Sequence, residues 1–222
     1  MADRPYHHGD LRTALLDTAE ALIRERGVDG WSLREVSVRV GVSPSAAYHH
    51  FASRDALVQA LSQRVLARLG ERLTDAVERA RGDGADGLVA FGCGYVRWAL
   101  EDPAVARHWL AFNAGGGDPT ALHPHHILAA ELDRLVESGD LPAAARPGAD
   151  FVVWAAVHGL AALLVHGLMR LETPQAVDDQ AERVVRSTLI GLARQTPPPL
   201  GWPTPRSDYT ERVTGAPDGQ AG

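Results

Sequence analysis

The sequence contains no lysine, so its 22 Lys and Arg positions are all arginine. Together with the many Ala, Gly and Pro residues, this usage is typical of a GC-rich bacterial gene. A single cysteine, Cys93, excludes an internal disulfide. No segment approaches the roughly 20 uninterrupted apolar residues of a membrane span, and the polar first residues do not resemble a secretory signal. We therefore expect a cytoplasmic protein without a membrane partner.

The charge balance limits the kinds of partner. A formal net charge of −6 argues against a protein that coats nucleic acid without selectivity. It does not exclude a protein that reads DNA, because only the charge on the contacting face matters. With 222 residues, of which 45% are hydrophobic, the chain can form one large domain or a small domain joined to a medium one.

Apolar residues recur at helical spacing, and strand-like alternation is rare. This pattern predicts an all-α fold of nine helices over residues 10–26, 32–40, 43–49, 53–80, 85–101, 103–112, 125–138, 147–171 and 174–195. Side chains suited to N-caps begin four of these segments, namely Asp10, Ser32, Ser43 and Ser53. Ser32 and Glu35 have the spacing of a capping box, in which each side chain binds the backbone N–H of the other. Residues 197–222 are rich in Pro, Gly, Thr and Asp, which predicts a disordered tail.

The segments 32–40 and 43–49 have the pattern of a helix-turn-helix. They are joined by Gly41 and Val42, and Pro44 stands at the first position of the second helix, where its missing N–H costs nothing. In this motif the second helix enters the major groove of DNA, where each base pair presents its own set of donors and acceptors.

The short side chains at the start of the second helix let the backbone approach the bases. We expect Ser45, Ala46 and His49 to read base edges, and Tyr48 and His50 to bind phosphates. Ser32 and Arg54 begin neighbouring helices, whose N-termini favour phosphate. The predicted DNA-binding residues are Ser32, Ser43, Ser45, Ala46, Tyr48, His49, His50 and Arg54. In the alternative interpretation, Tyr48 and Phe51 are core residues and the two histidines lie on a solvated face.

The segment from Gly9 to Leu57 resembles the DNA-binding domain of the TetR/AcrR repressors. The matching residues are Ala19–Ile23, Gly27–Val36, Gly41–Ser43 and Tyr48–Leu57. The resemblance implies a homodimeric repressor that a small-molecule effector of unknown identity releases from double-stranded, palindromic operator DNA. It also implies a helix-turn-helix domain over residues 1–55 and a ligand-binding and dimerisation domain over residues 56–196.

Two positions depart from the family pattern. The family usually has Lys at the position of Arg54, and many members carry Arg, Tyr or Asn where this chain has His49, which is weaker as a permanent cation. In the C-terminal half, Trp154–Gly159 followed by Leu160 resembles the Trp…His-Gly signature of one subclass, sometimes called the WHG domain.

Aromatic residues of the C-terminal half are candidates for an effector pocket, because such pockets combine apolar walls with a few polar groups. The predicted ligand-binding residues are Tyr95, Trp98, Trp109, Phe112, Trp154 and His158. Packing of the core is the alternative role for each of them. The segments 147–171 and 174–195 are predicted to form the dimer interface as a four-helix bundle with those of a second subunit.

Other chemistry has weaker support in the sequence. Imidazoles at His123, His125 and His126 suit zinc, nickel or copper, but a metal site needs three or four converging ligands, so we predict a solvated loop and no metal. Cys93 is predicted to be a buried inert thiol, and a redox role stays open. No catalytic motif or phosphate-binding glycine loop is present, so we expect neither an enzyme nor a cofactor. A helical protein without DNA binding, or a regulator controlled by a protein partner, remain alternatives.

Overall fold

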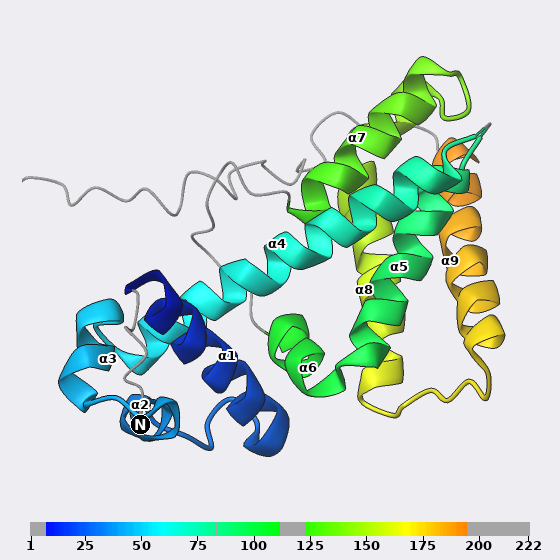
Figure 1. Cartoon of the computed structure of the whole chain (residues 1–222). Coiled ribbons are helices and arrows are strands. Elements are labelled where there is room, and N and C mark those ends of the chain that lie inside the picture. The colour runs from blue at the N-terminus through cyan, green and yellow to red at the C-terminus, as the bar shows by residue number, and fades with distance from the viewer. Residues whose placement is uncertain (1–7, 83, 112–122, 195–222) are drawn as a thin grey trace, which may run out of the picture.

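The computed structural model describes residues 8–82, 84–111 and 123–194, and all regular structure within these ranges is helical (Figure 1). The helices are α1 (His8–Arg26), α2 (Leu33–Val40), α3 (Pro44–His50), α4 (Arg54–Ala80), α5 (Asp86–Glu101), α6 (Pro103–Ala111), α7 (Pro124–Glu137), α8 (Ala149–Val165) and α9 (Pro174–Arg194), with a short 3₁₀ turn η1 (Ala143–Ala145) before α8. The all-α prediction is confirmed. The predicted tail lies outside the described residues.

Serine side chains begin α2, α3 and α4. The hydroxyl oxygens of Ser32, Ser43 and Ser53 accept hydrogen bonds from backbone amides three residues later, at 3.2, 3.2 and 3.0 Å. The capping box was only half right: the Glu35 carboxylate pairs with Arg26 at 2.9 Å instead of with the Ser32 amide. The Asp10 cap was wrong as well, because α1 already begins at His8.

Residues 147–171 do not form one continuous helix, as the sequence pattern had predicted. α8 ends at Val165, and Gly167 adopts a left-handed φ of 70°. The amides of Leu168 and Met169 both donate to the carbonyl of Leu163, at 2.9 and 3.1 Å, which closes the helix end. The apolar residues after Val165 therefore lie in the connection to α9.

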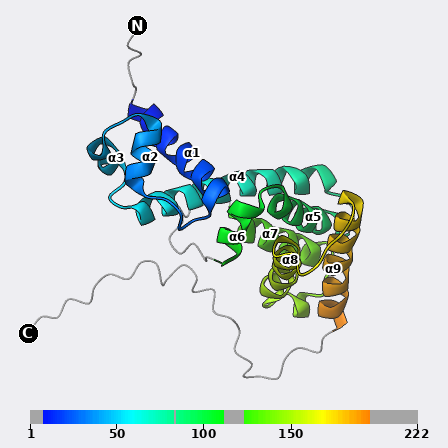
Figure 2. The ribbon, with the colours of Figure 1, turned by 90° about the horizontal axis from the view of Figure 1, so that it is seen from below.

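Two hydrophobic clusters form the cores. The N-terminal cluster gathers α1, α2, α3 and the first half of α4, and it includes Val105 of α6. The C-terminal cluster gathers the second half of α4 with α5, α7, α8 and α9. α4 runs across the predicted domain boundary between residues 55 and 56, and it extends from one cluster to the other (Figures 1 and 2). Trp98 packs against both clusters.

Ion pairs join α1 to the other elements at this junction. Arg24 on α1 donates to Asp102, which precedes α6, at 2.6 Å, and Arg64 on α4 donates to Glu20 on α1, also at 2.6 Å. Burial tends to raise the pKa of Glu20, but hydrogen bonds and charges from Arg24 and Arg64 outweigh it and lower the pKa. The carboxylate is thus held charged at the junction of the two cores.

α8 and α9 lie side by side, and both also pack on α5 (Figure 1). An apolar face of α9 points into the core, since Val177, Ala181, Val185 and Leu192 are buried. Among the described residues, none of the helices has the length and apolar character that crossing a lipid bilayer requires.

Candidate functional site

The turn between α2 and α3 positions the exposed face of α3. Gly41 closes α2 with a left-handed φ of 81°, which glycine adopts without steric cost, and its amide donates to Val38 at 3.1 Å. α3 then packs on α2 through Ala47, which is fully buried. Phe51, directly after α3, is 4% exposed, so it is a core residue.

The outward face of α3 carries three of the predicted DNA-binding residues. Ser45, Tyr48 and His49 are exposed, and their spacing of three and four residues places them on one side of the helix. Tyr48 is 52% exposed, which excludes the alternative in which it fills the core. Ala46 and His50 are half-buried at the flanks of this face.

Ser32 and Ser43 are exposed residues although their hydroxyls cap helices. A hydroxyl that accepts from a backbone amide keeps its own proton to donate. Both side chains can therefore donate to a phosphate without releasing their helix.

Arg54 is placed differently from the other predicted contacts. Its guanidinium lies over the ring of Trp31, 4.8 Å from the centroid, and it donates to the carbonyl of Val28. The carboxylates of Asp29 and Asp55 lie 3.5 and 3.4 Å from nitrogens of this guanidinium. These contacts attach the start of α4 to the loop between α1 and α2, so the role of Arg54 toward phosphate stays a prediction.

Arg12 and Arg34 were missed in the sequence analysis. Both are exposed, and among the described residues neither forms an ion pair, whereas Arg26 and Arg39 pair with Glu35 and Glu25. Arg12 lies over the ring of Phe51, 5.3 Å from its centroid, beside α3. Arg12 and Arg34 differ from the other arginines of this domain only in having no ion pair within the described part of the chain. Ion pairs can be identified only in the folded structure, so the sequence carried no signal for these two residues.

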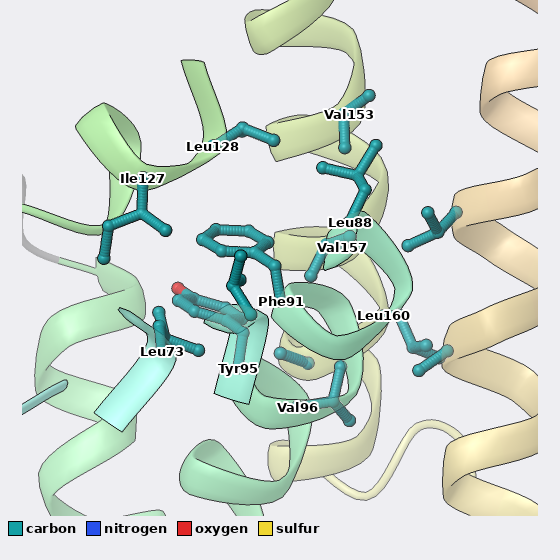
Figure 3. Close-up of a cluster of buried hydrophobic side chains, with 14 of the residues drawn as sticks. Leu73, Leu88, Phe91, Tyr95, Val96, Ile127, Leu128, Val153, Val157 and Leu160 are labelled. Carbon is teal, nitrogen blue, oxygen red and sulfur yellow. The ribbon is translucent and has the colours of Figure 1, made fainter. Parts of the chain in front are cut away.

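Tyr95 lies at the centre of an aromatic cluster in the C-terminal core. Its ring stacks on that of Phe91, with the ring centroids 6.4 Å apart. The centroid of Tyr95 lies 5.7 Å from that of Trp98 and 5.2 Å from that of Trp154. Its hydroxyl is 3.0 Å from Nδ1 of His158, within hydrogen-bond distance. Burial raises the pKa of Tyr95, which keeps the phenol neutral. Figure 3 shows Tyr95 and Phe91 packed among aliphatic side chains of the surrounding helices.

Four of the six predicted ligand-binding residues thus meet in one cluster: Tyr95, Trp98, Trp154 and His158. Phe112 and the side chain of Trp109 lie outside the described residues. A hollow of about 230 Å³ adjoins this cluster at Trp98, on the side of the junction between the two cores. It is lined on that side by charged residues that include Glu20, Arg24 and Arg72.

Comparison with known proteins finds a family model for each half of the chain. The model of bacterial regulatory proteins of the tetR family matches residues 15–61, and the model of the tetracyclin repressor-like C-terminal domain matches residues 88–188. Together they cover more than half of the chain. The chain belongs to the TetR family. This is a family of regulatory proteins and not of enzymes, as the sequence analysis had predicted.

Curated relatives of this TetR-family protein are similar over part of their length. The HTH-type transcriptional regulator YobS of Bacillus subtilis is 30% identical over 89 residues, which cover 40% of this chain and 46% of that protein. The HTH-type transcriptional repressor NemR of Escherichia coli K12 is 33% identical over 82 residues, 37% of this chain and 41% of that protein. The chain therefore spans less than half the length of these two relatives.

Solved structures match along most of the chain. A protein of unknown function from Rhodococcus sp. RHA1 has a TM-score of 0.71 and 29% identity, and the match covers 86% of this chain and 100% of that one. A TetR-family transcriptional regulator from Pectobacterium atrosepticum has a TM-score of 0.64 and 22% identity, with 87% and 99% covered, which shows the shared fold alone.

The histidines before and within α7 do not converge on a metal site in the described part of this TetR-family protein. His125 Nε2 instead lies 3.1 Å from Asp150 on α8. Burial, reinforced by His126 and His125, lowers the pKa of His123 to about 4, so this imidazole stays neutral. Burial and the nearby Asp178 raise the pKa of Cys93 to about 11, which disfavours the reactive thiolate.

Proposed function

We propose that this protein is a dimeric transcriptional repressor that binds a palindromic operator through α3 and is released by a small-molecule effector. The proposal rests on one observation: Ser45, Tyr48 and His49 form an exposed face on a helix-turn-helix whose α2 and α3 pack together. A helix with short and polar outward side chains fits the width of the major groove. Arg12 and Arg34 supply cations beside it.

Within this proposal the side chains divide into two roles. Ser45 and His49 face base edges together with Ala46, whose methyl group suits the methyl of thymine. Tyr48, His50, Ser32 and Ser43 donate to phosphates, which fixes the position of α3 in the groove. Footprinting on the region upstream of the gene tests the proposal: a protected, roughly palindromic site supports it, and the absence of protection at low salt contradicts it.

Replacing Arg34 by alanine should weaken DNA binding without changing its sequence preference. Each lost phosphate contact lowers the slope of log affinity against log salt by about one unit, so a dimer should lose about two. The matched control is Arg79→Ala, because Arg79 is exposed at the far end of α4 and donates only to a carbonyl of its own helix. An unchanged slope in Arg34→Ala would remove Arg34 from the phosphate contacts.

We infer that the dimer forms through α8 and α9. Val152 and Leu163 on α8 and Ile190 on α9 are apolar but exposed, at 44%, 40% and 51%. An added Cβ at Gly159 or Gly191 would meet no atom within 4 Å, so the backbone of both helices is open to close approach. An exposed surface that combines large apolar side chains with glycine backbone favours the packing of a helix from a second subunit. A two-fold dimer would place its two α3 helices about 34–36 Å apart.

The aromatic cluster around Tyr95 is the proposed effector site. The apolar rings would hold an apolar molecule, and the Tyr95–His158 hydrogen bond offers one polar anchor. Trp98 packs against both hydrophobic clusters, so a molecule that displaces this ring would also strain the contacts of the DNA-binding domain. This arrangement favours release of DNA by a small molecule over control by a protein partner.

The effector site predicts a selective consequence for Trp154→Leu. In a thermal-shift screen, an effector should raise the melting temperature of the wild-type protein saturably and should release DNA in a mobility-shift assay. Trp154→Leu should reduce both responses by about tenfold or more in effector concentration, since a buried aromatic contact contributes about 1–3 kcal/mol. Its DNA affinity without effector should change little. Equal loss of DNA affinity would assign Trp154 to the core instead.

A further inference from the structure

The helix-turn-helix segment has little permanent charge of its own. Residues 11–57 contain six arginines and six carboxylates, so their formal charge is zero when the histidines are neutral. Within the part of the chain that the structure describes, four of the arginines are ion-paired, namely Arg24, Arg26, Arg39 and Arg54. DNA binding depends on cations that replace the counterions of phosphates. This domain therefore meets DNA with few free cations.

Besides Arg12 and Arg34, which are unpaired among the described residues, the source of positive charge in this segment is histidine. Residues 43–53, which include α3, contain no arginine, and their imidazoles are those of His49 and His50. His49 is exposed and His50 is half-buried. The two rings contact each other edge-on, with centroids 5.9 Å apart. Among the described residues neither imidazole is hydrogen-bonded or ion-paired, so both are available to a partner.

The carboxylates around α3 are already paired with arginines, whereas Arg12 and Arg34 form no ion pair among the described residues. In α2, in the first turn of α4 and from Leu11 onward in the start of α1, the described charged side chains are Arg12, Arg34, Glu35, Arg39, Arg54 and Asp55. Both carboxylates pair with arginines, Glu35 with Arg26 and Asp55 with Arg54. Because these carboxylates are paired, a phosphate placed against α3 would be the unbalanced negative charge near the two imidazoles.

We propose that DNA binding is coupled to proton uptake by His49 and His50. The inference rests on the proposed function, because it requires α3 to face DNA. A histidine ordinarily titrates near pH 6.5, and an adjacent phosphate favours its protonated form. The affinity for DNA is therefore highest at low pH. It falls as the pH rises, over the range in which the imidazoles are protonated in the DNA complex but not in the free protein. Each coupled proton changes affinity by at most about tenfold per pH unit.

The test measures DNA affinity by fluorescence anisotropy at constant ionic strength, with two probes: a short duplex from the upstream region and a random duplex of equal length. Between about pH 6 and pH 8 we expect the affinity of the wild-type protein for both probes to fall about 10- to 50-fold. The slope of log affinity against log salt concentration should be steeper at the lower pH, by up to about two units per subunit.

Variants assign the protons to these two residues. The double variant His49→Gln/His50→Gln keeps polar side chains but cannot be charged, so it should lose the gain in affinity at low pH and give a flat profile. His49→Arg should bind more tightly than the wild type at pH 8, about fivefold or more, because its charge is permanent. His166→Gln is the matched control, since His166 is exposed at the end of α8 and bonds only to the carbonyl of Ala162; it should keep the wild-type profile.

The outcomes separate this inference from the function on which it rests. Wild-type protein that binds DNA equally at both pH values would overturn the proton coupling and leave the repressor proposal intact. A double variant that keeps the wild-type dependence on pH would overturn it too, by placing the protons elsewhere. Protein that binds neither probe at any pH would contradict the proposed function itself.

Discussion

Leu163→Glu is expected to convert the proposed dimer into monomers and to weaken operator binding by about 100-fold or more. Leu163 is 40% exposed on α8, on the face that carries Val152 and Gly159. In the dimer this side chain would be buried against the second subunit. A carboxylate buried there without a partner costs about 2–5 kcal/mol, and two-fold symmetry places the change in both subunits.

The loss in DNA binding follows from the loss of the dimer. A dimer that occupies two half-sites gains affinity because its second contact is intramolecular, and this gain is typically 10²–10⁴. A monomer keeps the same α3 face but binds only one half-site. Sedimentation velocity should therefore show the smaller species, and mobility shifts on a palindromic duplex should need correspondingly more protein.

The matched control is Ala130→Glu, which adds the same carboxylate to an exposed position of α7. It should leave both sedimentation and DNA affinity unchanged. Circular dichroism distinguishes dissociation from unfolding, because the monomer should keep its helix content. If Leu163→Glu sedimented as a dimer, α8 would not lie at the interface.

Local sequence rules predicted the helix-turn-helix domain closely. Serine caps, the Pro44 start and the Gly41 stop each act within one turn of helix, so neighbouring residues determine them. The same rules predicted too long a helix after residue 147, because the apolar run that ends in Leu168 and Met169 resembles a helix. The left-handed turn at Gly167 and the bonds to the Leu163 carbonyl end it sooner.

Long-range pairing limits what the sequence can predict about the sites. Arg54 and Arg34 are both arginines near helix starts, and nothing local shows that Arg54 stacks on Trp31 while Arg34 stays unpaired. Likewise, the aromatic residues of α5 and α8 form one cluster only because the two helices pack together. The types of residue in each candidate site could be predicted, but their assignment to core, ion pair or free surface required the fold.

Glu131 offers a test of how the C-terminal core is held together. It lies on α7 and is 1% exposed, a rare position for a carboxylate. Arg81 after α4 donates to it at 2.9 Å and Arg134 on α7 at 3.0 Å. Arg134 also donates to the carbonyl of Gly84, at 2.7 Å, so the cluster attaches α7 to the connection between α4 and α5.

Glu131→Gln should lower the free energy of unfolding by about 2–3 kcal/mol, because it leaves two arginines facing a buried neutral group. This loss of stability is smaller than the loss expected for a fully buried ion pair, because the side chain of Arg81 is 51% exposed. For a protein of this size the melting temperature should fall by about 4–12 °C. Glu137→Gln, an exposed change on the same helix, should shift it by less than about 2 °C.

A substitution at Gly87 tests whether α5 and α7 pack closely at Glu131, as the burial of this carboxylate indicates. A Cβ added at Gly87 on α5 would collide with Oε2 of Glu131, so Gly87→Ala should destabilise the protein on its own. In the Glu131→Ala background the obstructing carboxylate is gone. The double variant should then lose less stability than the sum of the two single variants, by about 1 kcal/mol or more in chemical denaturation. Strictly additive losses would mean that α5 and α7 do not meet at this carboxylate.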